Sequence, residues 1–443
     1  MEPKYDPACR SSTPDCCTDP SSALNIRSVA LKHRLDRLGF PGTRDPHAGP
    51  LPGTRAEVLA ELRERIAEVV GTPDRPRPPP ADPAKTELPF VADTTPSGTV
   101  YRRTERLRPS HHVGRIPTDA ARLASVEVLA LLALDPTLGL TEPARALYLD
   151  CESTGLGGAG TVAFLVGLGW FDGGHLVLEQ LLLKSPADER ALLEVVSSRM
   201  DRASLLVTYN GKTFDRPLLS TRCVMTGLPS LADRPHLDLL HVARRLHRGR
   251  LGVCRLVDLE SSVLGFERGP DIEGAEVAAR YSHFLRSGDE GALRAVVDHN
   301  AWDVLTMAAL VGLYGEPLPA LHDRDLLGLA ETYRRARALD HAEGAAACAE
   351  ERGVGPEAVK LQARIAKARG DRARALSRFE DLARSVDDPD VRLELAKLYE
   401  HHVKEPALAL RVVESGTSET EAATEHRRRR LQRKLARRTG SRG

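Results

Sequence analysis

Four acidic residues and one histidine stand where they could do chemistry together. Asp150 and Glu152 end an apolar run in YLDCEST, and Asp215 follows another in TYNGKTFD. Asp303 lies in the helical pattern VVDHNAWDVLTMAAL, one helical turn after His299. Side chains two apart on a strand point the same way, and neighbouring carboxylates repel each other unless a cation lies between them. The spacing therefore indicates a cation site.

This set of side chains matches metal-assisted hydrolysis of a phosphodiester. Hard oxygen ligands without clustered cysteine or histidine are typical of Mg²⁺ or Mn²⁺ sites. Two such ions about 4 Å apart can stabilise the attacking and leaving oxygens, and a nearby histidine can take the proton of the attacking water. A D-x-E pair alone is common. The combination is stronger because each acid lies at the end of an element in an apolar context.

Composition limits the class of protein. The chain has 443 residues, which suggests roughly three domains, and its 63 Lys+Arg and 62 Asp+Glu leave a net charge of +1. Any affinity for nucleic acid must therefore come from local basic patches. Without an apolar run of membrane-spanning length or an apolar leader, we expect a cytoplasmic protein that binds no membrane. The seven cysteines form no CxxC pair, which excludes a zinc ribbon.

The first part of the chain predicts little folded structure. Residues 1–95 combine a polar tail with helical patterns at 23–39 and 55–70. The proline-rich run at 73–83 cannot form a helix interior or a ladder, so we interpret it as a linker. We expect a largely disordered, partly helical N-terminal region.

The middle of the chain predicts a mixed α/β domain. Strand patterns and helix patterns alternate, and Asp172-Gly173-Gly174 predicts a tight turn between two of the strands. The expected strands are GTVYRRTERL, 146–150, 161–171, 175–183 and 205–210, and the expected helices are 119–134, 186–200 and 213–226.

The C-terminal part predicts helical repeats. Equivalent positions at Asp340, Asp371 and Glu405 are spaced by about 31 and 34 residues, the period of tetratricopeptide-like repeats. A generic helical bundle is the alternative. These repeats would span 322–415, and a basic tail would follow at 416–443. The tail can be a solvated helix or a contact for phosphates, and both interpretations stay open.

Three segments resemble the motifs of a known family. LDCESTGL, TYNGKTFDRPLL and HNAWD resemble, in order, the three motifs of the DEDD 3′–5′ exonucleases. Residues 97–315 as a whole resemble the YprB-type ribonuclease H-like proteins. The resemblance implies an α/β fold with a ribonuclease H-like mixed sheet flanked by helices. It also implies an all-α region of tetratricopeptide-like repeats after that domain.

The same resemblance implies roles for the acids. Asp150 would bridge two Mg²⁺ or Mn²⁺ ions, Glu152 and Asp303 would complete the first ion's shell, and Asp215 would act partly through water. His299 would be the general base. It lies four residues before the last aspartate, whereas histidine-type members usually place it five before, and four is the spacing of the tyrosine-type members.

Further residues are candidates for substrate binding. The resemblance places the segment of Thr154, Gly155 and Leu156 beside the terminal nucleotide. Three residues near Asp215 could also contact the substrate. The amide of Asn210 could form a hydrogen bond with it, the ammonium of Lys212 could contact a phosphate, and the ring of Phe214 could stack on a base. Phe214 is as well explained as a core residue.

Two neighbouring features carry rival interpretations. Asp238 ends an apolar run, where it could orient metal ligands or cap a helix. The segment 244–255 holds five arginines, which could form a path for phosphates or a solvated helix face.

The sequence therefore predicts a metal-dependent 3′–5′ exonuclease acting on single strands of DNA or RNA. One alternative is a structure-selective endonuclease using the same acids. Another is a scaffold with a catalytically silent nuclease-like domain, and a third is a hydrolase of small phosphates. A protein partner on the repeats, such as a helicase, is a further hypothesis.

Overall fold

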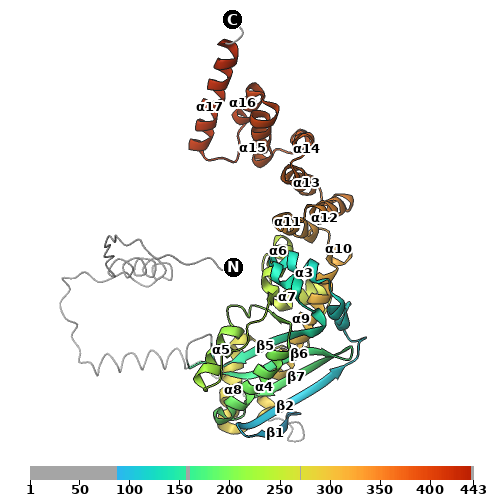
Figure 1. Ribbon diagram of the computed structural model, residues 1–443, viewed down its shortest axis with the longest axis vertical. Coiled ribbons are helices and arrows are strands. Elements are labelled where there is room, and N and C mark those ends of the chain that lie inside the picture. Colours follow the sequence, from blue (N-terminus) through green and yellow to red (C-terminus); the bar gives the residue numbers. More distant parts are fainter. Residues whose placement is uncertain (1–86, 156–159, 270, 441–443) are drawn as a thin grey trace, which may run out of the picture. The chain divides into compact units, whose positions relative to one another are not determined.

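The computed structural model describes residues 87–155, 160–269 and 271–440, drawn in colour in Figure 1. The chain divides into two compact units, 1–80 and 81–443, and the described residues all belong to the second. The predictions for the helical patterns at 23–39 and 55–70, for the linker at 73–83 and for Leu156 lie outside the described residues.

The centre of the described unit is one sheet of seven strands in the order β1-β2-β7-β6-β5-β8-β9. The bounds are β1 Val91–Thr95, β2 Gly98–Leu107, β5 Ala146–Ser153, β6 Ala163–Asp172, β7 His175–Leu182, β8 Leu205–Thr208 and β9 His236–Asp238. Neighbours from β1 to β5 pair antiparallel, and β5, β8 and β9 pair parallel. This is the expected mixed sheet, and it already begins at Val91.

The turn between β6 and β7 is where the sequence predicts it. Asp172 pairs with His175 across a two-residue turn. Gly173 and Gly174 have φ angles of 53° and 83°, a left-handed backbone that glycine adopts without steric cost. This hairpin fixes the register of β6, the strand that lies beside β5.

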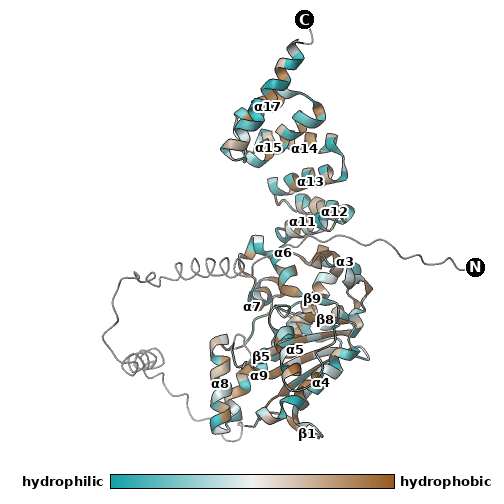
Figure 2. Ribbon diagram, turned by 60° about the vertical axis from the view of Figure 1, so that its left-hand side comes forward, coloured by the Kyte–Doolittle hydropathy of each residue, from teal (hydrophilic) through white to brown (hydrophobic). Residues whose placement is uncertain are grey.

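Helices cover both faces of the sheet. One face packs against α4 Glu189–Arg202, α5 Asp215–Met225 and α8 Gly274–Ser287. The other packs against α3 Val126–Ala133, α6 Leu239–Leu251 and the long helix α9 Arg294–Gly315. Figure 2 shows the apolar residues gathered in the strands and on the facing sides of the helices.

The alternation of side chains along β5 decides where the acids point. Leu147 and Leu149 belong to the core on the α4 face, and Tyr148 belongs to the core on the α9 face. Because side chains alternate along a strand, Asp150 and Glu152 share the α9 face with Tyr148. The strand thus aims both carboxylates at α9.

The helix expected at 119–134 is broken. A 3₁₀ turn, Thr118–Leu123, is followed by α3, which begins at Val126. Ser125 caps α3 by accepting a hydrogen bond from the Val128 amide at 3.3 Å. A serine at the start of a turn competes with the helix interior, and that is the signal for the break.

Shorter elements complete this part of the unit. They are β3 His112–Val113, β4 Ile116–Pro117, α7 Leu256–Leu259, the π-helical turn η6 Glu260–Leu264, and α10 Pro317–Ala320. Single 3₁₀ turns lie at Pro136–Leu140, Pro143–Arg145, Pro186–Asp188 and Glu290–Leu293. Nowhere in the described ranges is there a helix of the length and apolarity needed to span a membrane.

The C-terminal part is helical, as expected. Three helix pairs follow one another: α11 Asp325–Arg335 with α12 Leu339–Glu351, α13 Pro356–Arg369 with α14 Arg372–Ser385, and α15 Pro389–Leu398 with α16 Pro406–Glu414. The second helix of each pair begins close to the positions whose spacing indicated a repeat. Small alanine side chains fill the contacts between these helices, among them Ala345, Ala346, Ala363 and Ala375.

The first of these helices is tied to the sheet domain by a buried polar network. Asp325 of α11 accepts hydrogen bonds from Arg250 of α6 at 2.7 Å and contacts His247 Nδ1 at 2.9 Å. His247 Nε2 contacts the hydroxyl of Tyr314, in α9, at 3.0 Å. All these groups except Arg250 are almost completely buried, and each has a partner.

The basic tail forms a helix, α17 Glu421–Gly440, and part of its charge is used inside the fold. Arg427, Arg430 and Lys434 surround the buried carboxylate of Glu400 at 3.1, 2.7 and 2.7 Å. Burial alone would raise the pKa of Glu400, but these cations outweigh it and lower that pKa to about 2. Three of the basic side chains thus have a structural role.

Candidate active site

The first two acids come from the middle of the sheet. Asp150 and Glu152 lie on β5, which is flanked by β6 on one side and β8 on the other. Opposite Asp150 in the register stands Gly167 of β6. A central strand buried among neighbours holds its side chains in fixed directions, which is what a constellation of charges needs.

An asparagine that the sequence analysis did not single out holds Asp150. Asn300 of α9 is completely buried, and its Nδ2 donates to Asp150 Oδ2 at 2.8 Å. Its Oδ1 accepts from Gln180 Nε2 of β7 at 2.9 Å. Gly167 makes room for this amide, because a Cβ there would overlap the Asn300 side chain.

The third and fourth groups come from α9 itself. Asp303 and His299 lie one turn apart, and His299 Nε2 is 3.6 Å from Asp303 Oδ2. His299 Nδ1 lies 2.7 Å from Asp271 Oδ1, in the segment before α8. If Nδ1 carries the proton and donates it to Asp271, Nε2 is left as the acceptor. Asp271 was also missed by the sequence analysis.

The remaining acid, Asp215, is the first residue of α5 and is only 4% exposed. The loop that leads to it from β8 is fastened to β9. Asp238 accepts hydrogen bonds from the amides of Asn210 at 2.8 Å and Lys212 at 3.1 Å. It also accepts one from the Leu240 amide at the start of α6, at 3.1 Å. Asp238 therefore caps α6, as one of its two interpretations predicted, and it also holds the loop that leads to Asp215.

The acids are close enough to disturb one another's ionisation. Burial, and then the charges of Asp303, Glu152 and Asp215, raise the pKa of Asp150 well above its usual range. Burial likewise raises the pKa of Glu152 and of Asp215 to about 7. The raised pKa values show that the positive charge near these carboxylates does not offset their burial and mutual repulsion.

One buried arginine contacts part of this group. Arg268, 5% exposed, binds the buried Glu260 through two hydrogen bonds of 2.5 and 2.6 Å. It also binds Asp303 and lies 3.4 Å from Asp271. Its guanidinium thereby contacts both Asp303 and Asp271, and its Nη1 also lies 3.2 Å from His299 Nδ1. Nothing in the sequence pattern pointed to Arg268.

The chemistry of the donors fits divalent cations such as Mg²⁺ and Mn²⁺. The group offers carboxylate oxygens from Asp150, Glu152, Asp215 and Asp303. The raised pKa values of the first three show that their ionised forms would be stabilised by a nearby cation. Within the described ranges, no three acidic, histidine or cysteine side chains are already arranged as a metal cage. Asp150 is hydrogen-bonded to Asn300 and Asp303 to Arg268, so two of the acids are bonded to protein partners instead.

The residues proposed for substrate binding lie in two places. Thr154 and Gly155 follow β5, and Thr154 Oγ1 accepts from the Val162 amide at 3.0 Å, which ties the loop to β6. Asn210 has a φ of 68° and forms a turn, in which its Oδ1 accepts from Thr213 Oγ1 at 2.9 Å. Beyond this turn, Lys212 is exposed and Phe214 is half-buried.

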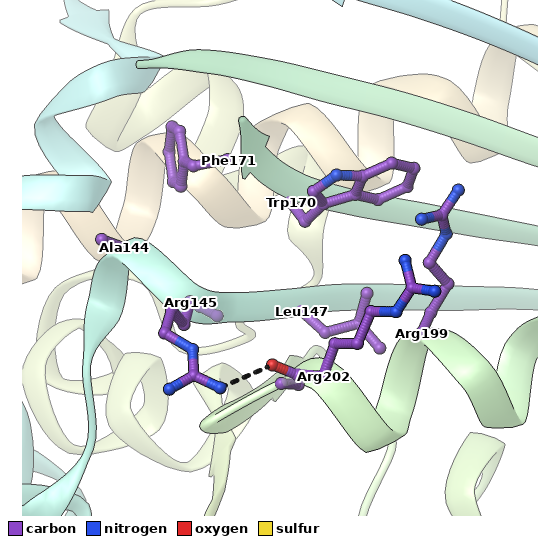
Figure 3. Close-up of a pocket in the computed structure, with 9 residues that line it drawn as sticks. Ala144, Arg145, Leu147, Trp170, Phe171, Arg199 and Arg202 are labelled. Atoms are coloured by element: carbon purple, nitrogen blue, oxygen red, sulfur yellow. Dashed lines mark hydrogen bonds between the residues drawn. The ribbon is translucent and has the colours of Figure 1, made fainter. Parts of the chain in front are cut away.

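A separate pocket of about 170 Å³ lies at the start of β5, away from the acids at its end (Figure 3). Two of its three basic side chains, those of Arg145 and Arg199, are engaged in the fold. Arg199 binds Glu179 at 3.0 Å and stacks on Trp170, and Arg145 donates to the Arg202 carbonyl at 3.2 Å. This pocket is therefore not part of the acid cluster.

The fold and the cluster of acids define a protein of the ribonuclease H superfamily, whose family model matches residues 147–314. Over 303 residues the chain is 31% identical to the uncharacterized protein YprB of Bacillus subtilis (strain 168). This match covers 66% of this chain and 73% of that protein. The chain belongs to the YprB family of ribonuclease H-like proteins, as the motifs predicted.

A solved structure matches more loosely. The family B DNA polymerase of the hyperthermophilic archaeon Pyrobaculum calidifontis is 19% identical over 51% of this chain and 29% of its own, with a TM-score of 0.31. A superposition this loose carries no conclusion about fold or activity.

Proposed function

We propose that the protein is a metal-dependent nuclease that removes nucleotides from the 3′ end of single-stranded nucleic acid. The observation that carries this proposal is the meeting of four carboxylates from β5, α5 and α9, three of which, Asp150, Glu152 and Asp215, have pKa values raised by burial and by neighbouring acids. Such a group of carboxylates would be stabilised by bound divalent cations.

In this proposal some residues would bind the metal ions and others orient the residues that bind them. Asp150, Glu152, Asp215 and Asp303 would hold the ions, with Asp150 between the two. When bound, Mg²⁺ or Mn²⁺ supplies Lewis-acid chemistry to the attacking and leaving oxygens of a phosphodiester. Asn300 keeps Asp150 pointed toward α9, and Arg268 keeps Asp303 in place.

His299 is proposed as the general base. With Nδ1 donating to Asp271, its Nε2 is free to accept a proton from water. This resembles the logic by which an aspartate orients a catalytic histidine and selects its tautomer. His299 precedes Asp303 by four residues in the sequence. This spacing is compatible with the role, because it still places the ring 3.6 Å from the Asp303 carboxylate.

The polarity of cleavage rests on the loops near the acids. Thr154 and Gly155 would lie against the terminal nucleotide. The exposed ammonium of Lys212 can meet a phosphate, while Asn210 shapes the turn that leads to Asp215. Phe214, half-buried just before α5, offers a ring for stacking on a base.

The test is a gel assay with strands labelled at the 3′ or the 5′ end, as DNA and as RNA, with Mg²⁺, Mn²⁺ or EDTA. We expect a metal-dependent ladder that begins at the 3′ end and disappears in Asp150→Asn and Asp303→Asn. Asp201→Asn, an exposed aspartate at the end of α4, is the matched control and should cleave normally.

A circular single strand separates the alternatives. It should resist an enzyme that needs a 3′ end, whereas its cleavage would assign the same acids to an endonuclease. If neither linear nor circular strands are cut with any metal, a binding scaffold replaces the enzyme as the better description.

A further inference from the structure

A groove of about 710 Å³ opens beside the turn that leads to Asp215. One wall is the outer side of α6, and the other is the segment just after that helix. Arg244 and Arg248 of α6 line it together with Asn210 of the turn. Because residues four apart on a helix share a face, the two guanidiniums stand one turn apart along the same wall.

Three of the five arginines in 244–255 have structural partners. Arg245 donates to the Leu132 carbonyl at 2.9 Å, and Arg250 binds the buried Asp325. Arg255 forms an ion pair with Asp258 at 2.7 Å. These three charges are largely neutralised or committed within the fold.

The other two are different. Arg244 and Arg248 are exposed, and neither guanidinium makes a hydrogen bond or an ion pair with any residue that the structure describes. Holding two like charges side by side without a counter-ion costs free energy unless an anion binds there. Guanidinium is also the side chain best suited to phosphate, because it can donate two parallel hydrogen bonds.

Apart from Arg255, which is paired with Asp258, most of the other side chains that line the groove are apolar. Val253 is 62% exposed, and the ring of Tyr209 lines the groove with its hydroxyl donating to the Cys254 carbonyl at 2.5 Å. A row of cations next to an apolar strip suits a single strand, whose phosphates and unstacked bases are both accessible. A duplex would offer only its phosphates.

One carboxylate links the groove to the acid cluster. Asp238 accepts from the amide of Asn210 in the turn and from the amide of Leu240 at the start of α6. The arginines of α6 are therefore held in fixed register with the turn that positions Asp215. A strand lying in the groove would be led toward the carboxylates.

We propose that this groove binds the backbone of single-stranded nucleic acid, with Arg244 and Arg248 each contacting one phosphate. The inference deepens the proposed function and rests on it, because it names the surface along which the substrate of that same site enters.

The test measures binding without cleavage. The full-length protein is titrated, in EDTA, into fluorescein-labelled 15-mers of thymidine or uridine nucleotides, and anisotropy is followed at several salt concentrations. Arg244→Gln/Arg248→Gln should weaken binding about tenfold near 0.1 M salt. The slope of log K against log salt should fall by about 1.4, at roughly 0.7 for each lost phosphate contact.

The matched control removes the same charge elsewhere. Arg372 and Arg411 are exposed residues of the C-terminal helices, and Arg372→Gln/Arg411→Gln should bind like the wild type. A groove variant with wild-type affinity and slope overturns the inference, even if the enzyme cuts normally. So does a duplex 15-mer that binds as tightly as the single strand and loses as much in the groove variant.

Failure of the proposed function gives a different pattern. Wild-type protein that binds the 15-mers through these arginines, but cleaves nothing in Mg²⁺ or Mn²⁺, supports the groove and refutes the nuclease. Asp150→Asn should keep its affinity in EDTA while losing cleavage, which separates binding from chemistry in one variant.

Discussion

Asn300 holds Asp150 by a 2.8 Å hydrogen bond from its amide to the carboxylate, across the space between α9 and β5. The amide is fixed in turn by Gln180, whose Oε1 accepts from Arg103 of β2 at 3.0 Å. The direction of the central acid therefore depends on a chain of polar contacts that crosses four elements of the fold.

Replacing Asn300 by alanine should reduce activity more than it reduces folding. Without the amide, Asp150 loses the partner that points it toward the other acids. Loss of such a supporting contact typically costs about 10- to 100-fold in activity or metal affinity. Cleavage rates measured over a series of Mn²⁺ concentrations should show a higher half-saturating concentration and a lower plateau.

The control for that variant is Gln362→Ala, which removes a buried amide from α13 that binds Glu350 at 2.7 Å. It should leave the Mn²⁺ dependence unchanged. An Asn300→Ala protein with a wild-type metal titration would show that Asp150 needs no such support.

Gly167→Ala should act on the same contact from the other side. The added methyl overlaps the Asn300 side chain, so the amide must move, and overpacking of this kind costs about 1–3 kcal/mol. The two changes should not be additive, because shortening Asn300 removes the overlap. Unfolding in urea and cleavage rates of the single and double variants test this. A double variant as poor as the sum of both would contradict the shared contact.

The stability of the metal-free protein should fall as pH rises. Glu152 and Asp215 have pKa values raised to about 7, and the pKa of Asp150 is also raised, against about 4 for unfolded acids. Between these values the folded state binds more protons than the unfolded state, so the free energy of unfolding decreases with increasing pH.

Asp150→Asn removes one of the repelling charges and should weaken this pH dependence. In EDTA near pH 8 its Tm should exceed that of the wild type by about 2 °C, and the difference should vanish near pH 4. Thermal unfolding followed at several pH values measures both. A wild-type protein whose Tm in EDTA rises steadily from pH 4 to 8 would show that the acids do not repel one another.

His299 should impose a rising limb on the pH–rate profile. Burial would lower its pKa, but the charge of Asp303, the hydrogen bond to Asp271 and the charge of Glu152 outweigh burial and raise the pKa above 6.5. A general base must be neutral, so kcat/KM should increase as pH passes through that pKa. His299→Gln should lower the plateau by about 10²- to 10⁴-fold.

The variant Asp271→Asn tests whether His299 acts as the general base or has only a structural role. It removes the carboxylate whose hydrogen bond raises the pKa of His299, so the rising limb should move to lower pH while the plateau falls. A profile that keeps its position in Asp271→Asn, or its full rate in His299→Gln, would assign the proton to another group.

The central strands and the acids could be predicted from sequence because their signals are local. Apolar runs mark β5, which ends in acids, and β8, which Asp215 follows, and the Gly173-Gly174 turn marks the β6–β7 hairpin. The family resemblance then supplied an order for the motifs. The break before α3 was missed because apolar spacing continues through Ser125, whose capping role outweighs it.

The supporting residues of the site were harder to find. Asn300 lies three residues before Asp303 on the same side of α9, and that spacing was an available signal. Arg268 and Asp271 come from an irregular segment with no periodicity, and only the tertiary path brings them to α9. The pairing of the tail with Glu400 spans about thirty residues, beyond the reach of any local charge pattern.

The network around Asp325 makes the first C-terminal helix, α11, part of the packing of the sheet domain. The carboxylate belongs to the first C-terminal helix, yet it satisfies His247 and Arg250 of the sheet domain. A chain cut between residues 315 and 325 would leave a buried imidazole and a guanidinium without their acceptor, and would uncover the apolar side of α6. Two polar side chains of the sheet domain thus depend on a carboxylate from the helices that follow it. The family motifs place the end of this domain near residue 315, but the buried contacts of the sheet domain continue into α11.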